Sequence, residues 1–205
     1  TLSGKNCKTK ILTMLETLIN WDTQLFLFLN DAQTPFWDKV MWAASEKEFW
    51  YPFYGLLIAL MGWRYKWNAI LTVLFIAITI TLADQISVKC FKFVFERLRP
   101  SHNPEIKDQV NILNNYRGGK FGFVSSHAAN TFALAAFMSR LLRNTYFTWF
   151  IFLWAAVVSY SRIYLGVHYP LDILGGAILG MSLGFVVFYL YFLFGKRYLK
   201  KTFSG

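Results

Sequence analysis

The chain has 205 residues, of which 56% are hydrophobic, 20% aromatic and only 16% charged, a composition too apolar for an ordinary soluble domain. Its many aromatic rings are typical of proteins whose side chains lie at a lipid–water boundary. A net charge of +10 could indicate a nucleic-acid-binding protein, but no nucleic-acid-binding module is recognisable, and anionic lipid headgroups account for the charge more simply. The sequence therefore predicts an integral membrane protein whose partner is the lipid bilayer and not a nucleic acid.

The N-terminal region, residues 1–47, is predicted to lie on the membrane surface. In residues 11–30 apolar and polar side chains alternate at roughly helical spacing, with Trp21 as an anchor, and residues 35–45 have the same character. We therefore expect amphipathic interfacial helices here, followed by a transmembrane domain over residues 48–205. A helical hairpin that enters the bilayer is the alternative. No cleavable signal peptide is expected, because the apolar segment after the polar start is interrupted by charged residues.

Apolar stretches in the rest of the chain approach the roughly 20 residues needed to cross a bilayer. The fold class predicted from them is an all-α, polytopic helical membrane bundle with about five transmembrane helices. The expected spans are residues 49–63, 68–93, 127–142, 146–164 and 171–194. In the last of these, glycines three to four residues apart predict close helix packing: Gly175, Gly176, Gly180 and Gly184.

Basic residues in the short connections predict how the bundle is oriented. They follow the first, third and fifth spans, which end on one side of the membrane, and the positive-inside rule makes that side cytoplasmic. The lysines of the N-terminus would then lie outside, which opposes this bias. We expect a multi-pass protein of the inner (plasma) membrane whose opposite, extracytoplasmic face carries the longest polar loop, residues 97–122. The residues that set the bias are Arg64, Lys66, Arg140, Arg143, Lys196, Arg197, Lys200 and Lys201.

Three polar clusters fall on the extracytoplasmic face, and the first is "KCFKFVFERLRP", residues 89–100. Lys92 and Arg99 are seven residues apart, so on a continuous helix they differ by about 20° and share a face. Two long cations on one face can bind a multiply charged anion, and arginine offers the paired donors that phosphate oxygens match. The structural alternative is a pair of interfacial basic residues, one of them paired with Glu96.

The second cluster, "FVSSHAANTF", spans residues 123–132. Ser125 and Ser126 precede an apolar helical stretch, as N-cap residues do, and the unpaired N–H groups at a helix start form a natural anion site. The alternative is ordinary capping with His127 as a surface histidine.

The third cluster, "SRIYLGVHYPLD", spans residues 161–172. Pro170 is suited to the first turn of a helix, which places Asp172 near the N-terminus of the last span and His168 just outside it. Because Asp172 follows His168 by four residues, its carboxylate can hydrogen-bond one ring nitrogen of His168 and leave the other nitrogen free. This is the arrangement of an oriented nucleophile or base. A structural cap beside an interfacial histidine is the alternative.

A metal site is a further alternative, because all three histidines are predicted on this face. Basic side chains in the same clusters would repel a cation, and the histidines do not have the spacing of a metal-binding motif. We therefore expect no metal and no other cofactor, and no chemical role for His102.

Together, the three clusters resemble the motifs of the type 2 phosphatidic acid phosphatase family, whose fold is shared with vanadium haloperoxidases. Lys92, Arg99 and Pro100 match the first motif, Lys-x6-Arg-Pro, and residues 161–172 match the third, Ser-Arg-x5-His-x3-Asp. In the second motif, Pro-Ser-Gly-His, only the serine and histidine match, because Val124 replaces the proline and Ser126 the glycine. A serine at that position would be strained if the backbone required positive φ.

The resemblance implies a metal-independent phosphatase of lipid phosphates. His168, oriented by Asp172, would form a phosphohistidine, and His127 would protonate the leaving oxygen and then activate water. The other matched residues would bind the phosphate: Lys92, Arg99, Ser125, Ser126 and Arg162. Related bacterial enzymes act on undecaprenyl diphosphate, which is the first expectation, on phosphatidylglycerol phosphate or on phosphorylated lipid A. The alternative is an anion or lipid transporter, which would need cations along a path across the bilayer, whereas here they lie at one end. Asp84 and Gln85, inside the second span, are the only indication of such a path, and we interpret them as interhelical hydrogen bonding.

Overall fold

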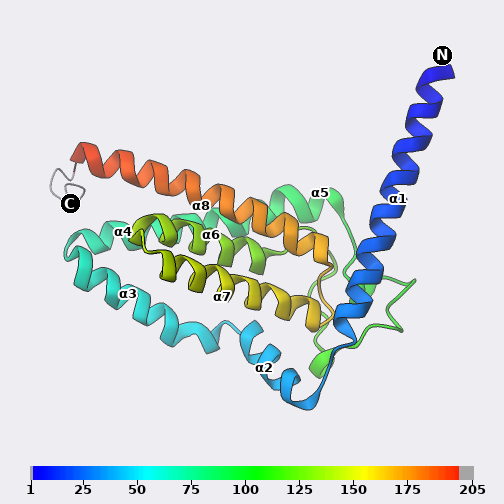
Figure 1. Cartoon of the computed structure of the whole chain (residues 1–205), viewed down its shortest axis with the longest axis horizontal. Coiled ribbons are helices and arrows are strands. Elements are labelled where there is room, and N and C mark those ends of the chain that lie inside the picture. The colour runs from blue at the N-terminus through cyan, green and yellow to red at the C-terminus, as the bar shows by residue number, and fades with distance from the viewer. Residues whose placement is uncertain (1, 199–205) are drawn as a thin grey trace.

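The computed structural model describes the main chain of residues 2–198 and the side chains of residues 10–197, and the described chain is built from helices (Figure 1). The fold class predicted from the sequence is confirmed. The long helices are α1 (Leu2–Asn30), α2 (Pro35–Ser45), α3 (Tyr51–Tyr65), α4 (Asn68–Ile86), α6 (Ser126–Leu142), α7 (Thr145–Tyr164) and α8 (Pro170–Tyr198). A π-helical segment (Ser87–Lys92) and the short α5 (Phe93–Phe95) extend α4, and three single 3-10 turns are Glu48–Trp50, Pro100–His102 and Leu113–Asn115.

Helix α6 lies in the centre of the bundle, packed against α4, α7 and α8. Its sequence is rich in alanine, and most of its side chains are buried. The glycines of α8 face it, because a Cβ at Gly176, Gly180 or Gly184 would collide with main-chain oxygens of α6. The predicted stripe of small residues therefore brings these two helices into backbone contact, where a larger side chain would hold them apart.

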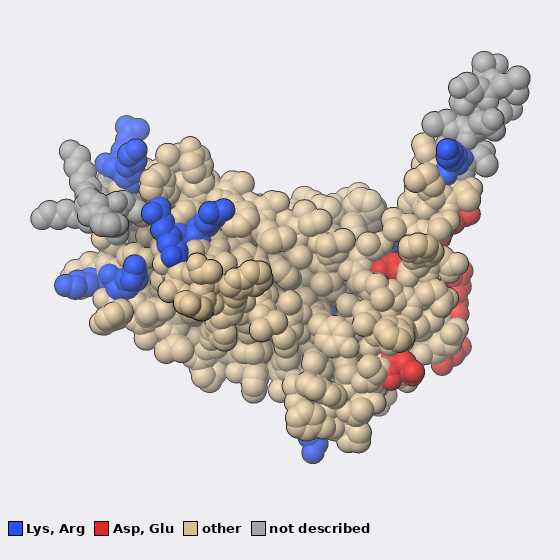
Figure 2. Space-filling model, viewed as in Figure 1, with Lys and Arg blue, Asp and Glu red and all other residues tan. Residues whose placement is uncertain are grey.

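The two ends of the bundle differ in their charge. At one end, the polar end, α5 finishes, α6 begins and α7 meets α8 (Figure 1). At the other end, the basic end, lie the α3–α4 and α6–α7 connections and the end of α8, and Figure 2 shows Lys and Arg gathered there, whereas Asp and Glu gather at the polar end of the face shown. All three polar sequence clusters therefore lie at one end, as the alternation of the spans predicted.

Fewer helices are long enough to cross a membrane than the sequence predicted. Among the described residues, three helical stretches are long and apolar enough to cross a bilayer: Asn68–Phe95, Thr145–Tyr164 and Pro170–Arg197. Helices α3 and α6 have 15 and 17 residues, which is short of that length. The expected count of about five spans is therefore not confirmed, and α6 is enclosed by neighbouring helices.

Helix α1 crosses the polar end at a steep angle to the bundle (Figure 1). It docks through residues spaced four apart, Asp22, Phe26 and Asn30, which are buried, while most of its other side chains are exposed. The amide of Asn30 donates to the main-chain oxygens of Asn111, Ile163 and Tyr164. The predicted helix over residues 11–30 is therefore present, and one narrow face of it is fixed to the polar end.

Candidate active site

His168 and Asp172 form a hydrogen-bonded pair where α8 begins. Pro170 opens the helix, as predicted, and Asp172 lies in its first turn. The Oδ2 atom of Asp172 accepts the main-chain N–H of Tyr169 at 3.0 Å and lies 3.3 Å from Nδ1 of His168. Because an ionised carboxylate only accepts hydrogen bonds, Nδ1 carries the proton and the lone pair on Nε2 is available for bonding.

The His168 ring is buried, with 1% of the residue exposed, so it is not the interfacial histidine of the structural alternative. Burial lowers the pKa of His168 well below its usual value, and the positive charges of Arg99, Arg162 and Lys92 lower it further. The imidazole is therefore neutral at physiological pH. A neutral, oriented imidazole surrounded by cations has the properties of a nucleophile toward an anionic substrate.

Arg97, to which the sequence analysis gave no role, holds the other side of the Asp172 carboxylate. Its Nη1 donates to Oδ1 of Asp172 at 2.8 Å, and its Nη2 donates to Oδ2 of Asp22 at 2.5 Å. Asp22 also accepts the N–H of Leu171, and the Arg97 guanidinium lies 4.0 Å from the centre of the Tyr169 ring. Arg97 therefore fixes Asp172 and connects α1 to the site. Both carboxylates lie 75 residues away in sequence, so no local pattern signals this contact.

Arg99 reaches the site through a reversal of the chain and not along a helix. Helix α5 ends at Phe95, and Glu96 adopts the left-handed conformation with φ 46°. The expectation that Lys92 and Arg99 share a helix face is therefore wrong, because the helix ends before Arg99. The Nε of Arg99 donates to the main-chain oxygen of Phe121 at 3.1 Å. The part of the long loop that returns to the site therefore positions this side chain.

The long loop, residues 97–122, packs its backbone directly on the site. Gly118 has φ +63°, and a Cβ there would collide with the guanidinium of Arg99. A Cβ at Gly122 would lie 2.8 Å from Oδ2 of Asp172 and 3.3 Å from Cγ of Arg99. Both positions therefore require glycine, and the loop forms one wall of the site.

Arg162 and Arg99 each carry a buried N–H group that has no partner. Arg162 donates through Nη1 to Ser45 Oγ and through Nη2 to the Tyr116 hydroxyl, the latter at 3.0 Å. Its Nε, and Nη1 of Arg99, are buried and make no hydrogen bond within the described part of the chain. Unpaired buried donors on a guanidinium are unfavourable unless an anion accepts from them. These two groups therefore fit a bound phosphate.

Helix α6 brings the second sequence cluster to the same place. The hydroxyl of Ser125 caps the helix by accepting the N–H of Ala128 at 3.4 Å. Ser126 is the first helical residue and has no positive φ, so the strain considered for a serine here does not arise. Its Oγ accepts from Nζ of Lys92 and bonds Oγ of Ser87, both at 2.8 Å. Ser126 therefore holds Lys92 beside the start of α6.

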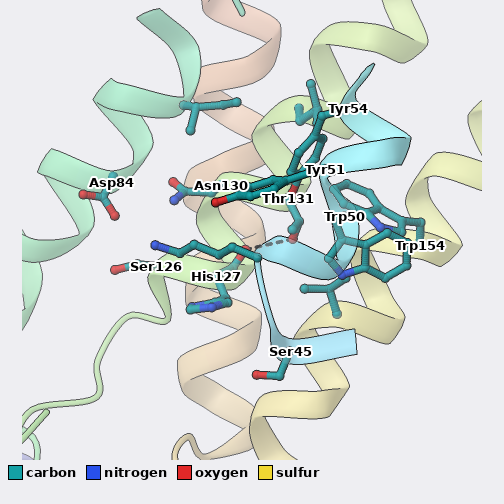
Figure 3. A pocket seen from close by; sticks show the side chains of 14 residues that line it. Ser45, Trp50, Tyr51, Tyr54, Asp84, Ser126, His127, Asn130, Thr131 and Trp154 are labelled. Atoms are coloured by element: carbon teal, nitrogen blue, oxygen red, sulfur yellow. Dashed lines mark hydrogen bonds between the residues drawn. The ribbon is translucent and has the colours of Figure 1, made fainter. Parts of the chain in front are cut away.

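His127 faces a cavity of about 300 Å³ that adjoins these groups (Figure 3). Burial lowers the pKa of the His127 ring below its usual value, and the nearby charges of Arg162, Lys47 and Lys92 lower it further. Its exposure to the cavity leaves the ring accessible to a bound molecule, whereas His168 is enclosed. His127 therefore faces the cavity side of the site, whereas His168 is buried within it.

The structure brings together at the polar end every residue that the motifs predicted for the site: Lys92, Arg99, Ser125, Ser126, His127, Arg162, His168 and Asp172. His102 stays in the loop, where its ring bonds Ser101 Oγ at 3.1 Å. Among the described side chains, no group of three or more His, Cys, Asp or Glu is arranged to hold a metal. The arrangement can bind a phosphate with several cations and present a neutral imidazole to it.

Comparisons with known proteins agree with this chemistry. The family model of the PAP2 superfamily matches residues 69–196. Lipid A 4'-phosphatase of Bacteroides thetaiotaomicron is 46% identical over 180 residues, 86% of this chain and 80% of that protein. Lipid A 4'-phosphatase of Porphyromonas gingivalis is 37% identical over 186 residues, 90% of this chain and 79% of that protein. The crystal structure of a PAP2-type phosphatidylglycerolphosphate phosphatase from Bacillus subtilis matches with a TM-score of 0.63 at 23% identity, covering 89% of this chain and 88% of that one.

Proposed function

This chain belongs to the PAP2 superfamily and is a membrane-bound lipid phosphatase, and on that premise we propose that it hydrolyses a phosphate ester of a lipid A-type glycolipid. The observation that carries the phosphate chemistry is the pair of unpartnered donors, Arg99 Nη1 and Arg162 Nε, beside the neutral His168 ring. A phosphate bound there would complete the hydrogen bonding of both arginines and present its phosphorus to the imidazole.

In the first step, Nε2 of His168 attacks phosphorus and the bond to the leaving oxygen breaks. Asp172 stabilises the positive charge that develops on the ring, and Arg97 keeps the carboxylate in place. The negative charge of the bound phosphate favours the protonated form of the His127 ring, and this imidazolium gives its proton to the leaving oxygen, so the lipid departs as a neutral alcohol. Lys92, the two arginines and the start of α6 stabilise the charge on the remaining phosphate oxygens.

In the second step, the deprotonated His127 accepts a proton from water while the water oxygen attacks the phosphohistidine. The bond from phosphorus to Nε2 of His168 breaks, and inorganic phosphate is released. Both histidines return to their initial protonation states, which closes the cycle. The protein side chains supply the acid, the base and the nucleophile for both steps.

The choice of lipid A over undecaprenyl diphosphate rests on similarity to the relatives. The motifs alone are shared by enzymes that act on several lipid phosphates, and undecaprenyl diphosphate was the first expectation from them. The 46% and 37% identical relatives are both named for lipid A, and each aligns over more than four fifths of this chain. Their names support a sugar phosphate as the substrate.

The test is phosphate release by the purified protein from a panel of lipids: phosphorylated lipid A, undecaprenyl diphosphate and phosphatidylglycerol phosphate. We expect the highest kcat/KM with lipid A, and mass spectrometry of the product should show that the phosphate has left the 4' position. Activity should persist in excess EDTA, because the residues present supply each catalytic group. A higher kcat/KM for undecaprenyl diphosphate would contradict the substrate assignment.

We also propose that the polar end faces the extracytoplasmic side of the inner membrane. The Lys and Arg side chains that gather at the basic end, on the face that Figure 2 shows, support this orientation under the positive-inside rule. The substrate phosphate would then be bound from the outer leaflet.

Cysteine labelling in intact cells should report this orientation. With Cys7 and Cys90 replaced by serine, a cysteine at exposed Asp108, in the long loop, should react with a membrane-impermeant thiol reagent. A cysteine at Trp67, which is 86% exposed at the basic end, should react only after the membrane is opened. If an outer membrane blocks the reagent, spheroplasts replace intact cells. The reverse pattern would place the site in the cytoplasm.

A further inference from the structure

The cavity beside His127 is bounded by α3, α4, α6 and α7, with side chains from each of these helices pointing into it (Figure 3). Its volume of about 300 Å³ lies at the lower end of small-molecule sites, roughly 300–1,000 Å³. His127 and Ser126 line one side of it, so it is continuous with the groups that would hold the phosphate. A substrate whose phosphate occupies the site therefore has space for its next group here.

Two buried polar atoms in the cavity wall have no hydrogen-bond partner within the described part of the chain. They are the amide oxygen of Asn130, on α6, and the indole N–H of Trp154, on α7. The residue Trp154 is 5% exposed. Trp50, in the same wall, differs because its indole N–H donates to the main-chain oxygen of Ala44 at 2.9 Å. An occupant that both donates and accepts would supply partners for this acceptor and this donor, which lie on two helices that line one cavity.

The other side chains that line the cavity indicate which kind of molecule it can bind. The rings of Trp50, Tyr51 and Tyr54 give one side of the cavity an aromatic character (Figure 3). Asp84 on α4 lines the opposite side (Figure 3), and within the described part of the chain its carboxylate does not make the interhelical hydrogen bond expected from the sequence. A carboxylate, an amide and aromatic rings together suit a ring bearing hydroxyl or amide groups. Lys47 also lines the cavity, so a cation and a carboxylate are both available to polar groups of the occupant.

We propose that this cavity is the leaving-group subsite and that it binds a sugar ring through Asn130 and Trp154. The proposal rests on the proposed function, in which His127 protonates the leaving oxygen. Because that oxygen must lie within reach of the His127 ring, the group attached to it occupies the cavity that the ring faces. A hydroxyl or amide of the sugar donates to Asn130 and accepts from Trp154. A leaving group without a free hydroxyl or N–H cannot donate to Asn130, and the site would discriminate against it.

The experiment compares two lipid monophosphates in kcat/KM: a lipid A-type glucosamine phosphate, and phosphatidic acid, whose diacylglycerol leaving group carries no free hydroxyl or N–H besides the leaving oxygen. Trp154→Phe removes the indole N–H, and Asn130→Leu removes the amide at similar size. Each variant should lower the ratio of kcat/KM, sugar lipid over phosphatidic acid, by about fivefold, which corresponds to the roughly 1 kcal/mol that one hydrogen bond contributes.

Trp63→Phe is the control, because it makes the same change at an indole that is 78% exposed and does not line the cavity. It should leave the ratio within about twofold. An unchanged ratio in both Trp154→Phe and Asn130→Leu would overturn the proposal, as would an equal loss on both substrates. If Trp154→Phe does not fold, the ratio of kcat/KM in Asn130→Leu alone tests the proposal.

Binding of the sugar alone separates this proposal from the proposed function. N-acetylglucosamine should raise the Tm of the wild-type protein and should not raise that of Asn130→Leu. A wild type that binds the sugar but releases no phosphate from lipid A would contradict the proposed substrate and support the subsite. Phosphate release from lipid A without any shift in Tm, and with an unchanged substrate ratio in the variants, would overturn the subsite alone.

Discussion

Replacement of His168 by alanine is expected to lower kcat/KM by at least about 10⁴-fold, because the variant lacks the atom that bonds to phosphorus. Since His168 is fully buried, alanine would also leave a space in the site. His168→Gln, which keeps most of the volume, should be equally inactive. Phosphate release by the purified variants measures the effect, and size-exclusion chromatography with thermal unfolding shows that they are folded.

Asp172→Asn is expected to be impaired by about 10²- to 10⁴-fold. An amide facing Nδ1 favours the opposite tautomer of His168, and that tautomer places the proton on the nucleophilic Nε2. The change also leaves Arg97 with one carboxylate, Asp22, in place of two.

His102→Ala is the control for both substitutions, because this histidine lies in the loop outside the site. The variant should retain kcat/KM within about twofold of wild type. Turnover by either His168 variant close to that of wild type would refute the phosphohistidine mechanism.

The sequence was sufficient to predict the parts of the site that depend on short spacing. The four-residue distance between His168 and Asp172 gives their hydrogen bond, and the serine before the apolar stretch gives the N-terminus of α6. Alternation of the spans placed the three clusters at one end. These predictions were possible because helix geometry and chain direction determine them locally.

Other features depend on tertiary contacts that no local pattern encodes. Arg97 meets its two carboxylates only when α1 docks on the start of α8, and Arg99 reaches the site by a return of the long loop. The apolar stretch that forms α6 was expected to be a span, but its small side chains allow three helices to enclose it. Asn130 and Trp154 lie in apolar stretches where a polar atom without a partner is visible only in three dimensions.

The contact between α6 and α8 should be the position at which the fold tolerates change least. A Cβ at Gly180 would lie 2.9 Å from the carbonyl carbon and 3.0 Å from Cα of Ala129, and still closer to its oxygen. Because these are main-chain atoms of a helix, they cannot rotate away as a side chain would. The two helices would have to separate, and they carry His127 on one side and Asp172 on the other.

Gly180→Leu is therefore expected to destabilise the protein by about 3 kcal/mol or more and to abolish phosphate release, as read from thermal unfolding in detergent and from activity. The matched pair Gly180→Ala and Gly55→Ala tests the cause. Gly55, in α3, has no atom within 4 Å of an added Cβ, so alanine there should raise Tm through its better helix propensity. The same change at Gly180 should lower Tm, because the collision outweighs a gain of about 1 kcal/mol. An increase of Tm in both variants would show that α6 and α8 are not held at backbone contact.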